Sequence, residues 1–227
     1  MKDNDRFLSE FMQSVDLTLF TPSLHQYFLD FLEIEKVRRF GDQFVINSFI
    51  PPFPSAAFDR FLSAFFGKEE KPPIQSVDLA VTNACMFHCW HCYNAGRLVS
   101  DLPPELLKRV LGELQELGAM VVNFTGGEPC LRHDLVEICS ALREDSCGVL
   151  STTGYGFTDE MAERLRETRV YSVAVSLDSP DEKEHDRKRG VKGAFDIALR
   201  GIETAKKWGF YTYTCTVPSR ELLEEEN

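Results

Sequence analysis

An alternation of apolar runs with amphipathic segments, which begins at Ser76, constrains the fold of this chain more than any other feature. Near-continuous apolar strands that alternate with helices indicate a parallel sheet covered by helices on its faces. The expected strands are 76–82, 119–125, 147–153, 170–177 and 210–217. The expected helices are the segment between an N-cap at Asp101 and a stop at Gly118, then 133–144, 158–168 and 193–208.

Right-handed crossovers curl such a sheet into part or all of a barrel, and the active sites of such barrels lie at the carboxyl ends of the strands. We therefore predict an α/β fold, a partial TIM-like barrel in which five strands are visible. Polar and glycine-rich motifs stand at four of the strand ends, which predicts a single site there. The motifs are a cysteine-rich loop after the first strand, Gly-Gly-Glu-Pro after the second, Thr-Thr-Gly after the third and Ser-Leu-Asp-Ser at the fourth.

Three cysteines within eight residues, Cys85, Cys89 and Cys92, have the spacing C-x3-C-x2-C and directly follow the first expected strand. Three thiolates can hold three irons of a cubic iron–sulfur cluster and leave the fourth iron without a protein ligand, whereas most electron-transfer clusters use four cysteines. Two alternatives stay open. One is a zinc site, which usually needs four ligands and can draw on His88 or His91, and the other is simple packing.

The second motif contains Gly126, Gly127 and Glu128 at the end of the second expected strand. Two adjacent glycines let backbone approach a ligand without obstruction by a Cβ atom. The Glu128 carboxylate is an acceptor for an ammonium group. Alone, the same residues are compatible with an ordinary turn, and the case for a site depends on their position after the cysteines.

With these two motifs in their order, the sequence resembles the radical SAM superfamily. Members of that superfamily carry C-x3-C-x-Φ-C after the first strand of a partial (β/α)6 barrel, and His91 stands where Φ is usually aromatic. The resemblance implies a [4Fe-4S] cluster on the three cysteines. It also implies S-adenosyl-L-methionine, whose amino and carboxylate groups chelate the open iron. Reductive cleavage of this cofactor yields methionine and a 5′-deoxyadenosyl radical that abstracts hydrogen from a substrate.

The same resemblance implies roles for the other polar residues at the strand ends. The motif at 126–128 would hold the methionyl amino group, and Thr152 would help hold the carboxylate. Ser176 would contact a ribose hydroxyl or the carboxylate, and Arg189 would pair with the carboxylate because a guanidinium suits that geometry. Each has a plainer alternative: Thr152 can simply end a strand, and Arg189 can belong to a solvated run of charges before a helix.

Residues 1–72 differ from the rest because they are rich in phenylalanine and show helical spacing, and we expect a small, mainly helical N-terminal extension. It either packs against the main domain or recognises a partner. Residues 73–227 are expected to form the radical SAM core. The superfamily core usually has six strands, and the chain most resembles the SPASM-type peptide and cofactor maturases. We therefore expect an N-terminal portion of a longer protein.

A formal net charge of −11 argues against broad binding of nucleic acid, which needs a basic surface. No run approaches the roughly 18 apolar residues of a membrane helix. Seven cysteines, an odd number, indicate a reducing, cytoplasmic compartment. Of these, Cys139 and Cys215 are expected in the core, and Cys130 near the mouth of the site.

Taken together, these features predict a radical SAM enzyme that acts on a peptide or a small cofactor precursor, with electrons from a flavodoxin or ferredoxin. The alternative is a non-catalytic iron–sulfur module for redox transfer or sensing, which would keep the cluster without needing the nucleoside cofactor.

Overall fold

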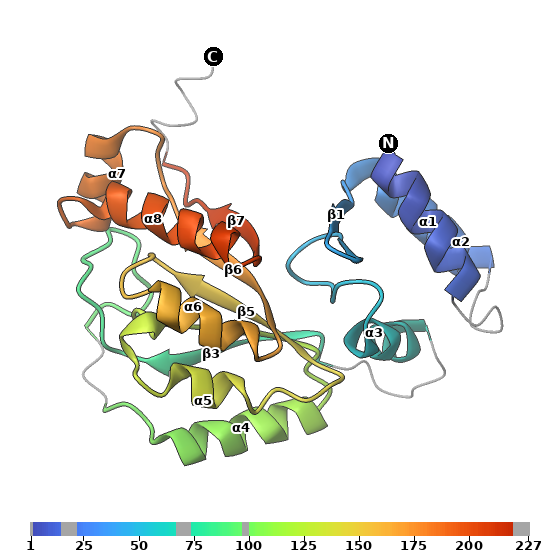
Figure 1. Cartoon of the computed structure of the whole chain (residues 1–227), viewed down its shortest axis with the longest axis horizontal. Helices are drawn as coiled ribbons and strands as arrows, with labels where there is room; N and C mark the ends of the chain where they lie inside the picture. The colour runs from blue at the N-terminus through green and yellow to red at the C-terminus, as the bar shows by residue number, and fades with distance from the viewer. Residues whose placement is uncertain (1, 15–21, 67–73, 97–99, 220–227) are drawn as a thin grey trace. The chain divides into compact units, whose positions relative to one another are not determined.

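The computed structural model describes most of the chain and divides it into two compact units (Figure 1). The described residues are 2–14, 22–66, 74–96 and 100–219. The first unit is drawn from 1–77, 114–121 and 143–147, and the second from 78–113, 122–142 and 148–227. The predicted linker at 67–73, with the predicted boundary between 72 and 73, lies outside the described residues.

The first unit is built around a cluster of phenylalanine rings. Phe7 and Phe11 are four positions apart in a helix, so they lie on one face, and both are fully buried. Phe53 and Phe58 close the cluster, with ring centroids 5.1 Å apart in an edge-to-face arrangement that aromatic pairs favour. The helices and strands of this unit are α1 (Lys2–Ser14), α2 (Pro22–Ile34), β1 (Arg38–Phe40), β2 (Gln43–Val45) and α3 (Ala56–Phe66).

The second unit carries the sheet predicted from the alternating pattern. Its five strands lie in the order of the chain, so each new strand adds to the same edge, as in a barrel wall (Figure 1). Strands β5, β6 and β7 are parallel, with Ser151 opposite Ala174 and Ala174 opposite Tyr213. The strands are β3 (Ser76–Thr82), β4 (Val121–Gly126), β5 (Cys147–Thr152), β6 (Val170–Ser176) and β7 (Tyr211–Cys215). All five predicted strands are confirmed.

The helices between these strands agree less closely with the prediction. They are α4 (Pro104–Glu116), the short 3-10 helix η1 (Pro129–Leu131), α5 (Leu135–Cys139), α6 (Asp159–Arg166), α7 (Glu182–Arg189) and α8 (Ala194–Lys207). The predicted N-cap at Asp101 is wrong, because α4 begins three residues later. Helix α7 was missed because its eight residues, EKEHDRKR, carry no apolar periodicity. It is defined by its ends: Asp181 accepts a hydrogen bond from the Glu184 amide, and Gly190 ends it in the left-handed conformation.

Among the described residues, none of the helices combines the length and the apolar character needed to cross a bilayer.

Candidate cluster and cofactor site

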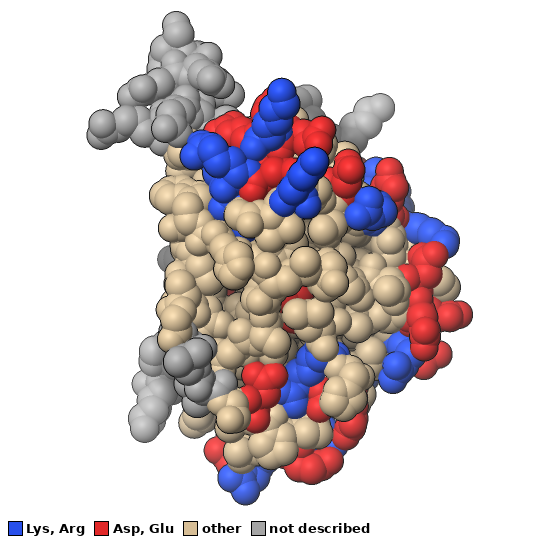
Figure 2. Space-filling view, turned by 90° about the vertical axis from the view of Figure 1, so that its left-hand side faces the viewer, with Lys and Arg blue, Asp and Glu red and all other residues tan. Residues whose placement is uncertain are grey.

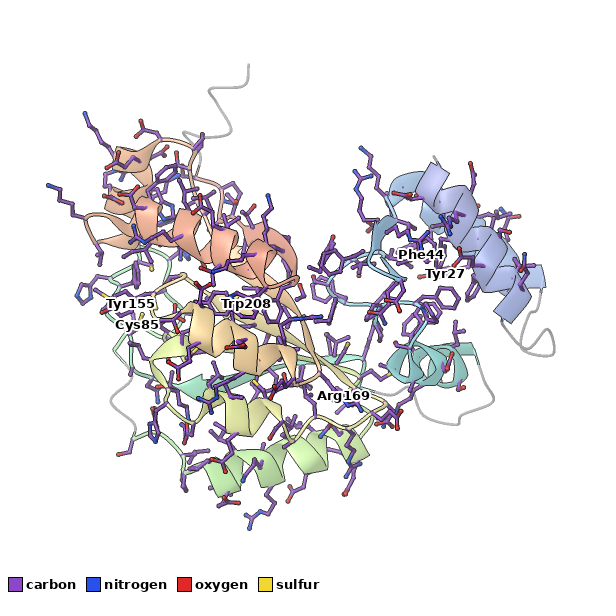
Figure 3. The ribbon with its side chains drawn as sticks, in the orientation of Figure 1. Tyr27, Phe44, Cys85, Tyr155, Arg169 and Trp208 are labelled. Atoms are coloured by element: carbon purple, nitrogen blue, oxygen red, sulfur yellow. The ribbon has the colours of Figure 1, made fainter. Side chains whose placement is uncertain are left out.

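A cavity of about 650 Å³ lies at the carboxyl ends of strands β3 to β6, where the alternating pattern predicted a site. Cys85 and Tyr155 mark this side of the sheet in Figure 3. Figure 2 views the molecule from that side and shows uncharged side chains over most of the middle, with charged ones along the margins. The lining includes eight of the nine predicted site residues: Cys85, Cys89, Cys92, Gly126, Gly127, Thr152, Ser176 and Arg189.

The cysteine loop leaves β3 and returns to α4, and its two ends are fastened together. The Asp101 carboxylate accepts hydrogen bonds from the Thr82 hydroxyl at 2.6 Å and from the Asn83 amide at 2.8 Å. The buried Arg132 guanidinium donates to the carbonyl oxygens of Val81 and Leu102, at 2.7 and 2.8 Å. The base of the loop is therefore closed by two charged side chains, neither of which the sequence pattern indicated as part of the site.

The three loop thiols differ in exposure: Cys85 and Cys92 are exposed, and Cys89 is half-buried. Burial raises the pKa of Cys85 and of Cys89, and for Cys89 the neighbouring Arg189 acts in the opposite direction. The Arg189 Nη1 atom lies 3.7 Å from the Cys89 sulfur.

The three loop sulfurs fit the ligand set of an iron–sulfur cluster, which is held by cysteine thiolates. The three ligands of a cubic cluster bind separate irons and need only face the same space, as Cys85, Cys89 and Cys92 do in lining one cavity.

The two glycines are required by the packing of backbone on backbone. A Cβ atom on Gly126 would lie 2.3 Å from the Thr82 carbonyl oxygen, and one on Gly127 would lie 2.2 Å from that of Ala84. The amides of Gly127 and Glu128 donate to these same two oxygens, each at 2.8 Å. The glycines therefore allow the end of β4 to pack closely against the start of the cysteine loop. Contact of these glycines with a ligand stays a prediction.

Glu128 is the predicted residue that does not line the cavity. Its side chain is fully buried, and both carboxylate oxygens are engaged by protein donors. Oε1 accepts from the Cys130 amide at 3.0 Å and the Thr152 hydroxyl at 2.7 Å. Oε2 accepts from the Thr153 amide at 2.7 Å and the Thr153 hydroxyl at 2.5 Å. The carboxylate therefore ties the end of β4 to the end of β5, directly behind the cavity wall.

Arg189 lines the cavity as part of a buried ion pair. Its Nη2 and Nε atoms each lie 2.9 Å from the carboxylate of Asp178, which is completely buried. The same carboxylate accepts from the Val217 amide at 3.1 Å. Ser176, the last residue of β6, is half-buried on the cavity wall. The solvated alternative for Arg189 is wrong, because its side chain is only 7% exposed.

Sequence reasoning missed a polar residue of the site. Asn94 is only 8% exposed and lines the cavity, and its Oδ1 atom has no hydrogen-bond partner among the described residues. His91 Nδ1 is likewise buried without a partner in the described part of the chain, and burial lowers the pKa of this imidazole. Unsatisfied buried polar atoms are uncommon in native proteins, and a ligand, ion or water bound in the cavity would supply their missing partners. Sequence reasoning had named His91 through its place in the cysteine motif, and the only signal for Asn94 is its position two residues after Cys92.

Two predictions about the remaining cysteines need correction. Cys130 lies behind the wall of the site, not at its mouth: it is buried, and its sulfur contacts the Thr152 hydroxyl. Cys215 is exposed because strand β7 is the outer strand of the five-stranded sheet. Cys139 is fully buried in the core, as predicted.

With this geometry established, comparison with known protein families matches residues 79–226 to the radical SAM superfamily. The chain belongs to that superfamily, whose members use a [4Fe-4S] cluster and S-adenosylmethionine. Fe-coproporphyrin III synthase of Methanosarcina barkeri is 37% identical over 148 residues, which cover 63% of this chain and 36% of that enzyme. Mycofactocin maturase MftC of Mycolicibacterium smegmatis is 34% identical over 133 residues, or 57% of this chain and 34% of MftC.

Among solved structures, Streptococcus suis SuiB bound to S-adenosylmethionine matches with a TM-score of 0.57 and 21% identity. The match covers 68% of this chain and 37% of SuiB, and it shows the fold, a radical SAM partial barrel. The chain thus spans about a third of the length of these relatives. The two curated relatives are a synthase and a maturase, which gives no support to the alternative of a non-catalytic module.

Proposed function

We propose that this chain supplies the cluster and cofactor site of an enzyme that cleaves S-adenosylmethionine reductively and uses the resulting radical to take hydrogen from a substrate. The observation that carries the proposal is the lining of one cavity by three loop thiols, the glycine edge of β4 and a buried arginine. When bound, the cluster supplies the electron that breaks the carbon–sulfur bond of the cofactor.

Different residues of the cavity are proposed to bind different parts of the cluster and the cofactor. Cys85, Cys89 and Cys92 would hold the cluster, and the backbone at 126–127 would bind the methionyl end of the cofactor. Ser176 offers a hydroxyl to its carboxylate or ribose. Thr152 donates its one hydroxyl proton to Glu128, so a hydrogen bond from Thr152 to the cofactor would require that bond to be exchanged. Arg189 is the cation of the cavity lining, which suits the cofactor carboxylate. Because the Glu128 carboxylate is engaged by Thr152 and Thr153, we assign it the role of holding the threonines in place instead of contacting the cofactor.

The substrate is proposed to be a peptide or a cofactor precursor. MftC is named as a maturase, SuiB has been crystallised with its precursor peptide SuiA, and the Methanosarcina relative is named as an Fe-coproporphyrin III synthase. A flavodoxin or ferredoxin is the proposed electron donor. All seven cysteines are free thiols, which agrees with the reducing, cytoplasmic compartment that we propose.

The proposal is tested by anaerobic reconstitution of the protein with iron and sulfide, followed by dithionite and S-adenosylmethionine. We expect release of 5′-deoxyadenosine, its loss in Cys89→Ala, and its retention in Cys215→Ala, whose exposed thiol does not line the cavity. A fully reconstituted cluster that releases no nucleoside would favour the non-catalytic module. Equal activity of the two variants would contradict the assignment of Cys89.

A further inference from the structure

The last turn of helix α7 holds the backbone on both sides of Cys89. The final carbonyl groups of a helix lack donors within the helix and must find them elsewhere. In α7 the Arg189 carbonyl accepts from the His88 amide at 3.0 Å, and the Lys188 carbonyl accepts from the Trp90 amide at 3.1 Å. The donors are the amides of the two residues that flank Cys89. The middle of the cysteine loop therefore supplies the hydrogen bonds that the last carbonyl groups of the helix lack.

The side chain of Arg189 reinforces this contact. Its guanidinium reaches the Cys89 sulfur at 3.7 Å while Asp178 holds it from the other side at 2.9 Å. Asp178 is itself fixed, because its amide donates to His185 Nδ1, on α7, at 3.1 Å. With the backbone at positions 88 and 90 fixed and a cation beside the sulfur, Cys89 has little freedom beyond rotation of its own side chain.

Gly190, which ends α7, packs directly against the cysteine loop at His88. Its φ of +68° is the left-handed conformation that glycine adopts without strain. A Cβ atom at this position would lie 2.7 Å from the His88 carbonyl oxygen and 2.9 Å from the His88 Cβ. Any larger residue must therefore push the loop away from the helix, even if its own backbone conformation is preserved.

We propose that the C-terminal turn of α7, closed by Gly190, is a positioning element that presents the Cys89 thiol to the iron–sulfur cluster. Gly190 is a positioning residue in this sense, since it acts through His88 and touches neither cluster nor cofactor. The inference rests on the proposed function only in taking Cys89 as a cluster ligand. The physical requirement is that a ligand sulfur be held in place before the cluster arrives, as supporting residues do at other metal sites.

The chain offers a matched control three residues away. Gly193 has a φ of +81°, so a substitution there meets the same left-handed backbone, but a Cβ atom on it would have no neighbour within 4 Å. Asparagine tolerates the left-handed conformation better than other non-glycine residues, which favours folding of both variants. The comparison is therefore Gly190→Asn against Gly193→Asn, with the corresponding alanine variants as a second pair.

The first measurement is retention of the reconstituted cluster against an iron chelator under anaerobic conditions. Because loss of supporting contacts weakens metal binding by about 10- to 100-fold, we expect Gly190→Asn to lose iron at least about tenfold faster than wild type. Gly193→Asn should match wild type. Equal loss from both variants, or loss from neither, would overturn the positioning role.

The second measurement needs no cluster. In the metal-free protein, amide hydrogen exchange of the peptide that contains His88 and Trp90 should be faster in Gly190→Asn and unchanged in Gly193→Asn. Unchanged exchange in both variants contradicts the contact itself. If exchange behaves as expected but wild type binds no cluster at all, the proposed function fails and the contact stands.

Discussion

Replacement of Glu128 by glutamine gives the sharpest test of how the wall of the site is held together. The substitution preserves shape and removes the charge of a fully buried carboxylate whose two oxygens accept four hydrogen bonds. Each oxygen accepts from one backbone amide, that of Cys130 or that of Thr153. A glutamine must place its NH2 group against one of them, so rotation of the side-chain amide cannot restore the network.

The expected cost follows from these contacts. One buried backbone N–H loses its acceptor, which costs about 1–3 kcal/mol, and the hydrogen bonds that remain lose the strength that the charge gave them. Glutamine is neutral, so the variant avoids the desolvation cost of burying a charged carboxylate, and this offsets part of the loss. We expect Glu128→Gln to lower the free energy of unfolding by about 3 kcal/mol.

Urea unfolding of the metal-free protein, monitored by tryptophan fluorescence, reports on the second unit, which contains Glu128. Trp90 and Trp208 lie in the same unit as Glu128, and the Trp208 indole donates to Asp159 at 2.7 Å, linking α8 to α6. A loss of about 3 kcal/mol moves the urea midpoint by roughly 1.5 M at a typical slope of about 2 kcal/mol/M.

The control is Glu137→Gln, a change of the same type at a side chain that is 49% exposed and paired with Lys108. Exposed pairs contribute little, so this variant should lose less than about 1 kcal/mol. If the two variants have the same midpoint, the carboxylate does not fasten β4 to β5 and the reasoning is refuted.

Three further predictions concern other parts of the chain. Phe11→Ala removes a fully buried ring from the phenylalanine cluster and should lower the free energy of unfolding, measured by calorimetry, by about 3–5 kcal/mol. The control Phe49→Ala, at a side chain that is 63% exposed, should be near neutral, and equal effects of the two changes would rule out the cluster as the core of its unit. Burial raises the pKa of Cys139 above its ordinary 9.0, so the folded state keeps a proton that the unfolded state loses. Wild-type stability should therefore fall above about pH 9 by about 1.4 kcal/mol per pH unit more steeply than that of Cys139→Ala, and parallel pH profiles in urea titrations would contradict this. Asp178→Asn leaves the Arg189 guanidinium buried without a counter-ion and should destabilise the protein by about 3 kcal/mol or more by urea unfolding; no change would show that the ion pair is not needed.

The sequence by itself determined the features that depend on neighbours along the chain. Apolar runs placed the strands, such as 76–82, because burial of a strand is encoded in consecutive residues. The spacing of Cys85, Cys89 and Cys92 is likewise local, and together with the glycine motif it is sufficient to indicate the superfamily. The order of these motifs along a βα series was enough to predict that they meet at one edge of the sheet.

Only the tertiary structure decided which partner each polar side chain takes. Glu128 faces Thr152 and Thr153 and not the cavity, since the partners of a carboxylate depend on how strands 24 or more residues apart come together. Helix α7 has no periodicity of its own, because it is defined by its caps and by contact with a loop about 100 residues earlier in the chain. Such contacts join residues that are far apart in the sequence and form only when the chain folds, so a local sequence pattern does not predict them.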